Sequence, residues 1–131
     1  MPAGDVSPFT VDQRRAIESA IAGAERTCGY AFSVWVGASE HDPRDHARRL
    51  HAQLPDPARS VLLLIDPTVR ALELVTGDSA RRDLDDSSAG LAALAMQTTL
   101  ASGDVANAIV RGLLQLAEHA RPPAMLHADS P

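Results

Sequence analysis

The chain has 131 residues, enough for one domain with a buried core, and 45% of them are hydrophobic. Its formal net charge is −5 and it contains no run of basic residues, which argues against nucleic acid or an anionic membrane surface as its partner. The single cysteine, Cys28, excludes an intrachain disulfide, and no apolar run approaches the roughly 18 residues of a membrane span. Because the first residues, MPAGDVSPFT, lack the pattern of a signal peptide, we expect a cytoplasmic protein.

The first predicted element is a helix over residues 10–28, which follows a flexible arm at residues 1–9. Thr10 and Gln13 have the spacing of a capping box, in which each side chain accepts a hydrogen bond from the other's backbone N–H. Gly29 is suited to end the helix in a left-handed conformation. The apolar stripe of this helix consists of Ile17, Ala20, Ile21 and Ala24.

Three apolar segments predict strands, at residues 30–36, 60–66 and 70–76. The first has apolar side chains on both faces, and the second is a continuous apolar run, which is typical of strands covered on both sides. A helix at 43–54, capped by Asp42, separates the first two strands and favours a parallel crossover between them. The short turn after the second strand favours an antiparallel hairpin. We therefore expect a mixed sheet with residues 60–66 in the middle.

The last third of the chain is predicted to be helical. The helices are expected at residues 86–101 and 104–120, with Gly103 between them, and a flexible tail at 123–131. The expected fold class is therefore α/β, with a small mixed sheet sandwiched between helices in a single domain at residues 10–122.

This order of elements resembles the TPM domain, a family named for thylakoid-lumen and photosystem-II repair proteins. The resemblance rests on AFSVWVG, SVLLLIDPTVRALELVTG, an acidic LDD segment and the final SGDVANAIVRGLLQLAEHA. The chain is most similar to an uncharacterised actinobacterial branch, the domain-of-unknown-function family 5130. The resemblance implies an α/β sandwich, and relatives that are described as acid phosphatases, calcium binders or adaptors in the maintenance of membrane proteins.

Four acidic residues are candidate ligands for a metal ion: Glu40, Asp42, Asp45 and Asp66. If the first two strands are parallel neighbours, their carboxyl ends bring these side chains to one end of the sheet, where ligands are often bound. Carboxylates suit Ca²⁺ or Mg²⁺, and such an ion could polarise a phosphoryl oxygen. Asp66 and Arg70 are then the candidate catalytic residues, with Arg70 holding a phosphate.

Three of the four acidic residues also have a structural explanation. Asp42 before Pro43 is a good helix cap, Asp45 suits the first turn of a helix, and Asp66 before Pro67 is a good first residue of a turn. His46 and His51 do not have the spacing of paired metal ligands, and we expect both to be solvated. Cys28 is expected to be a small buried apolar residue rather than a nucleophile.

Two interpretations of function follow from the sequence. The first is a non-catalytic interaction or adaptor module with an unidentified protein partner and no certain cofactor, because every residue that looks chemical has a sufficient structural role. The second is a divalent-metal-binding phosphatase that uses the acids around Asp66, with Ca²⁺ or Mg²⁺ as its ion. Binding of divalent cations distinguishes the two.

Overall fold

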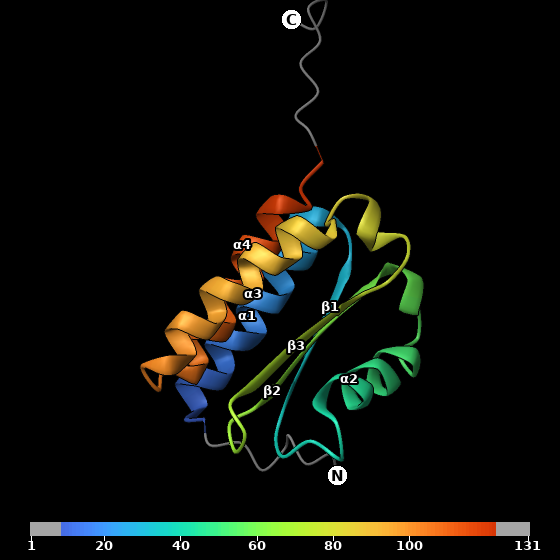
Figure 1. Ribbon diagram of the computed structural model, residues 1–131. Coiled ribbons are helices and arrows are strands. Elements are labelled where there is room, and N and C mark those ends of the chain that lie inside the picture. The colour runs from blue at the N-terminus through green and yellow to red at the C-terminus, as the bar shows by residue number, and fades with distance from the viewer. Residues whose placement is uncertain (1–8, 123–131) are drawn as a thin grey trace, which may run out of the picture.

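The fold is a three-stranded sheet between two layers of helices (Figure 1). The computed structural model describes residues 9–122, so that the predicted arm, apart from Phe9, and the predicted tail lie outside the described residues. The helices are α1 (Val11–Cys28), α2 (Pro43–Ala52), α3 (Asp86–Ala101) and α4 (Val105–His119), with short 3-10 turns η2 (Pro57–Arg59) and η3 (Ala80–Arg82). The strands are β1 (Ala31–Val36), β2 (Ser60–Asp66) and β3 (Ala71–Thr76). The predicted α/β class is confirmed.

The sheet has the order β1-β2-β3, with β2 in the centre. β1 and β2 are parallel and in register from the pair Ala31 and Ser60 onward, and β2 and β3 form an antiparallel hairpin. Every residue of β2 is buried, as expected for a central strand covered on both faces. The mixed sheet predicted from the apolar runs is therefore correct in order and direction.

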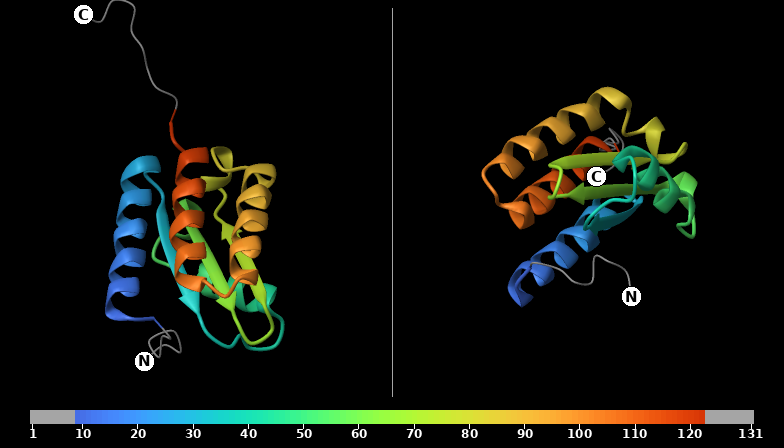
Figure 2. Two further views of the ribbon diagram at one scale, coloured as in Figure 1. Left: turned by 90° about the vertical axis from the view of Figure 1, so that its left-hand side faces the viewer. Right: turned by 60° about the horizontal axis from the view of Figure 1, so that its bottom comes forward.

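Three helices cover one face of the sheet, and α4 lies between α1 and α3 (Figure 2). This layer holds the main core, to which the sheet contributes alternate residues such as Phe32, Leu63 and Leu72. Gly112 of α4 allows a close approach to α3, because a Cβ atom there would lie 2.1 Å from Sδ of Met96. The largest fully buried side chains of the helices are Leu113, Leu116, Ile109 and Met96.

The second face of the sheet is covered by α2 alone and carries a smaller core. Leu62 and Leu64 of β2 pack against Ala47 there, and partly buried Trp35, Leu50 and Val75 surround them. α2 lies over β2 and β3, so the loop that leads from β1 into α2 passes the carboxyl end of β2. This loop carries Glu40 and Asp42, two of the four acidic residues that the sequence singled out.

Local side-chain chemistry explains where the helices begin. The capping box of Thr10 and Gln13 is present in both directions, and Gly29 has a φ of 83°, as predicted. Asp42, Asp85 and Asp104 each accept a hydrogen bond from the backbone N–H three residues later, at the starts of α2, α3 and α4. None of the helices within residues 9–122 is long and apolar enough to cross a membrane.

Candidate functional site

Asp66 is a buried carboxylate that joins two loops at the end of the sheet. It is the last residue of β2 and only 2% exposed. Its Oδ2 accepts hydrogen bonds from the backbone N–H of Ser39, at 2.7 Å, and from the Ser39 hydroxyl, at 2.5 Å. Its Oδ1 accepts from the backbone N–H and the hydroxyl of Thr68, at 2.9 and 2.5 Å. Both oxygens are thus engaged by groups of the protein itself.

These four donors determine the protonation state of Asp66. Burial by itself raises the pKa of the carboxyl, but the hydrogen bonds from Ser39 and Thr68 outweigh it and lower the pKa from 3.8 to about 2. The hydrogen bonds from Ser39 and Thr68 therefore keep Asp66 ionised at neutral pH. A carboxyl with this pKa is a poor proton donor for general acid catalysis at neutral pH.

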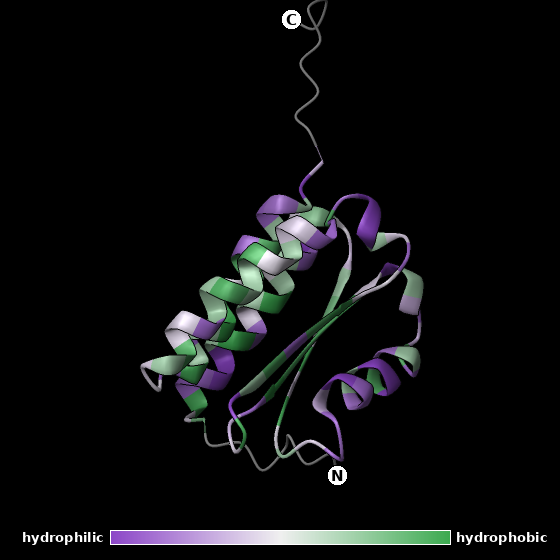
Figure 3. Cartoon of the chain, viewed as in Figure 1, coloured by the Kyte–Doolittle hydropathy of each residue, from purple (hydrophilic) through white to green (hydrophobic). Residues whose placement is uncertain are grey.

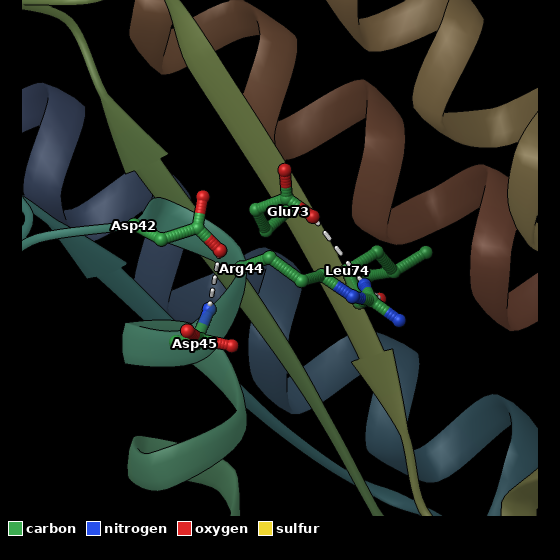
Figure 4. A network of polar contacts seen from close by, with 5 residues as sticks. All are labelled: Asp42, Arg44, Asp45, Glu73 and Leu74. Carbon is green, nitrogen blue, oxygen red and sulfur yellow. Dashed lines mark hydrogen bonds and ion pairs between the residues drawn. The ribbon is translucent and has the colours of Figure 1, made fainter.

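The other three predicted metal ligands lie on the loop before α2 and on its first turn. Asp42 is the helix cap and accepts from the backbone N–H of Asp45 at 3.2 Å (Figure 4). Glu40 and Asp45 are exposed, and Glu40 lies 3.9 Å from the guanidinium of Arg49. Within the described part of the chain, no three His, Cys, Asp or Glu side chains are placed to hold a metal ion. The metal site stays a prediction.

Arg70 lies beside Asp66 in a cavity of about 450 Å³ between the β2–β3 turn and the α3–α4 turn. Its backbone has a φ of 54°, a left-handed conformation that residues other than glycine rarely adopt. Its guanidinium takes part in no hydrogen bond or ion pair between described residues, so it is available to an anion. The walls of the cavity are mostly apolar and include Ile65, Leu100 and Val105.

The prediction that His46 and His51 are solvated is wrong. Both are buried, because they flank the apolar stripe of α2 that faces the sheet. Nδ1 of His46 accepts from the backbone N–H of Glu40 at 3.1 Å, and its ring packs edge-on against Trp35. Nε2 of His51 lies 2.9 Å from the carbonyl oxygen of Ser60, to which it donates. The two rings hold α2 to the sheet.

Cys28 is buried at the end of α1, and its thiol lies 3.2 Å from the carbonyl oxygen of Ala24. Burial raises the pKa of this thiol, which lowers the fraction of the reactive thiolate. The structure therefore gives Cys28 the environment of a packing residue and not of a nucleophile.

A groove along the free edge of β3 was missed by sequence reasoning. It has a volume of about 500 Å³ and runs between α2 and α3. Nη1 of Arg44 donates to the carbonyl oxygen of Leu74 at 3.0 Å and lies 3.4 Å from Glu73 (Figure 4). Arg81 donates to the carbonyl oxygen of Thr76 at 3.2 Å. Contacts between residues 30 positions apart, such as Arg44 and Leu74, have no signature in the local sequence.

The outward side of α3 is the second surface that the sequence did not reveal. Leu91 and Leu94 are 58% and 60% exposed, and with Ala95 and Thr98 they share one side of the helix at positions i, i+3, i+4 and i+7. After Asp86 the helix has no charged residue, whereas α2 is largely hydrophilic (Figure 3). Only Ala92 and Met96 of this apolar helix are buried. We call the side with Leu91, Leu94, Ala95 and Thr98 the outer face of α3.

Comparison with known proteins gives the family of the chain. The pattern of the family described as "Domain of unknown function (DUF5130)" matches residues 3–117. The chain belongs to the DUF5130 family. Two uncharacterised proteins from strains of Mycobacterium tuberculosis are each 25% identical to this DUF5130 chain over 115 residues, which is 88% of it and 69% of their own length.

Solved structures resemble this DUF5130 chain in fold. The BA42 protein of the psychrophilic bacterium Bizionia argentinensis superposes with a TM-score of 0.79 at 18% identity, covering 87% of this chain and 82% of its own. The N-terminal domain of a protein from P. gingivalis gives a TM-score of 0.75 at 16% identity, covering 86% and 76% of the two chains. The N-terminal domain of cg2496 from Corynebacterium glutamicum gives 0.68 at 13% identity, covering 93% and 82%. At these identities the likeness shows the fold alone.

Proposed function

We propose that this DUF5130 chain is a non-catalytic interaction module, similar in role to the adaptors among TPM domains, and that its main contact surface is the outer face of α3. The observation that carries the proposal is the exposure of Leu91 and Leu94 on a helix whose only charged residue is Asp86. A surface helix that does not bind a partner usually carries charged residues on its outward side.

The energy available at this face supports a protein partner. Fully burying a leucine side chain contributes about 1.5–3 kcal/mol, so that covering two leucines that are already partly buried contributes roughly 2–3 kcal/mol. A groove of about 480 Å³ adjoins the face, between α3 and α4, and is lined by small residues such as Ala95, Ala108 and Gly112. A partner that presents an apolar helix or loop would fit against the leucines and reach this groove.

The alternative, a divalent-metal-binding phosphatase, has less support. Both oxygens of Asp66 already accept hydrogen bonds, and Asp42 caps α2. Arg70 beside a cavity is the one feature that favours phosphate binding. A thermal-shift series with Ca²⁺, Mg²⁺ and Mn²⁺, together with an aryl-phosphate assay, tests it: a real site stabilises the fold by about 2.7 kcal/mol at one hundred times its dissociation constant. Neither stabilisation nor hydrolysis is expected.

We propose a cytoplasmic setting, with which a single free cysteine agrees. We propose a protein and not a nucleic acid as the partner, because the net charge is −5 and the outer face of α3 offers apolar contacts.

The test is affinity capture from the cells that make the protein, with a charged variant of the outer face. The double variant Leu91→Glu, Leu94→Glu should lose the captured partner, while its melting temperature should stay near that of the parent because both side chains point outward. Val69→Glu is the matched control, because Val69 is an equally exposed apolar residue, at 63%, on the β2–β3 turn. A captured set that is the same for the parent, the double variant and the control would contradict the proposal.

A further inference from the structure

The free edge of β3 carries backbone groups that no strand satisfies. Gly77 donates its N–H to Ser60 of β2, so the alternate residues Leu74 and Thr76 direct their N–H and C=O groups away from the sheet. Guanidinium groups of Arg44 and Arg81 occupy the two outward carbonyls in place of a neighbouring strand. In Figure 1, β3 is the edge that faces the viewer, between α3 and α2.

The groove beside this edge has room for an extended chain. Its α3 wall consists of Asp86 and the small residues Ala89, Gly90 and Ala93. A Cβ atom added to Gly90 would meet nothing within 4 Å, so the space beside this wall is open. The floor is β3 itself, from Leu72 to Thr76.

The groove is also more basic than the chain as a whole. Three arginines line it, Arg44, Arg48 and Arg81, against two acids, Glu73 and Asp86, in a chain with a net charge of −5. Arg48 has no hydrogen-bond or ion-pair partner among the described residues. The pair of Arg44 with Glu73 is partly exposed, and exposed pairs are weak, so Arg44 can exchange its partners at little cost.

We propose that the β3 edge binds an extended acidic segment of a partner protein, which adds to the sheet as a fourth strand. The inference rests on the proposed role as an interaction module and adds a second surface, on the opposite side of α3 from Leu91. The segment's N–H groups replace the guanidinium groups at the carbonyls of Leu74 and Thr76, and its carbonyls accept from the N–H groups of the same two residues. Arg44, once released, and Arg48 then pair with the segment's carboxylates, while Arg81 keeps its ion pair with Asp78.

The test uses two fluorescent hexapeptides of alternating residues, one of glutamate and valine and one of lysine and valine. Fluorescence anisotropy should show binding of the acidic peptide only, weakening as salt is raised. Arg48→Glu should weaken binding by about fivefold or more, because it replaces an attractive charge with a repulsive one. Arg15→Glu makes the same charge change at an exposed position on α1 and should leave binding unchanged.

Amide hydrogen exchange distinguishes strand addition from loose attraction between charges. In the parent protein, the peptide should slow the exchange of the Leu74 and Thr76 amides at least about tenfold, because both become hydrogen-bonded. Absence of peptide binding, binding that Arg48→Glu does not weaken, or binding without protection of these amides would overturn the inference; the arginines would then only guard the edge against unwanted pairing. The variant Leu91→Glu, Leu94→Glu should bind the peptide like the parent. The proposal for the outer face of α3 and the proposal for the β3 edge can therefore be contradicted independently.

Discussion

Ser39 and Asp66, 27 positions apart, are joined by two hydrogen bonds, one from the backbone N–H of Ser39 at 2.7 Å and one from its hydroxyl at 2.5 Å. Through this contact the loop that follows β1 is fastened to the carboxyl end of β2. The residue that looked most like a catalytic or metal-binding acid in the sequence is thus a buried connection between two loops, and its role in the fold can be measured directly.

Asp66→Asn should destabilise the fold by about 3 kcal/mol. The substitution replaces one carboxylate oxygen by an amide nitrogen, which cannot accept the two hydrogen bonds that either Ser39 or Thr68 donates to that oxygen. Urea denaturation measures the loss. Asp42→Asn is the matched control, because asparagine is as good a helix cap as aspartate, and it should change the stability by less than about 0.5 kcal/mol. Equal effects of the two substitutions would show that the four hydrogen bonds of Asp66 contribute little.

The same carboxylate predicts a dependence of stability on pH. Its folded-state pKa of about 2 is below 3.8, the value without these contacts, so its contribution to stability is fully present above about pH 4 and is lost as the pH falls toward 2. The shift corresponds to roughly 2 kcal/mol. The difference in unfolding free energy between the parent and Asp66→Asn should therefore shrink over this range. A constant difference would contradict the assigned pKa.

Two glycines in the helical layer should respond to alanine in opposite directions. Gly112→Ala places a methyl group 2.1 Å from Sδ of Met96 and should cost about 1–2 kcal/mol, because the buried Met96 side chain must shift to make room for it. Gly90→Ala enters open space within α3 and should gain about 0.5–1 kcal/mol. Thermal or urea unfolding of both variants provides the comparison. A loss of stability in Gly90→Ala would show that the groove along β3 has no room for the added methyl group.

Arg70→Gly should stabilise the fold by about 1 kcal/mol, because glycine adopts a φ of 54° without steric cost. Arg70→Ala removes the same guanidinium but keeps a Cβ atom, so it should bring no such gain. If both variants gain equally, the side chain and not the backbone conformation is the source of the effect.

Strong local patterns made most of the fold predictable. The continuous apolar run of β2 located the central strand, and Asp42, Thr10 and Gly29 marked the ends of helices because caps act within a few residues of one another. The burial of His46 and His51 was missed because they flank the apolar stripe of α2 without belonging to it. Their polar atoms are satisfied by Glu40 and Ser60, partners that depend on how the loop and β2 pack.

The surfaces proposed for binding were harder to predict for a different reason. The Ala- and Leu-rich sequence of α3 predicts a helix that is buried in the core. Leu91 and Leu94 are exposed because α3 lies at the side of the helical layer. Likewise, the sequence indicates that Arg44 is a solvated residue of α2. Its contact with Leu74 exists because α2 lies over β3. Tertiary packing, and not local propensity, decides which of these residues a partner can reach.

Site-specific photo-crosslinking at Leu94 shows directly whether the outer face of α3 is the contact surface. A photoreactive phenylalanine derivative in place of Leu94, activated in the cells that make the protein, should give a discrete crosslinked product that contains one partner protein. The same derivative in place of Arg15, an exposed position on α1, should not give this product. A crosslinked pattern that is identical at the two positions, or no product at Leu94, would contradict the account.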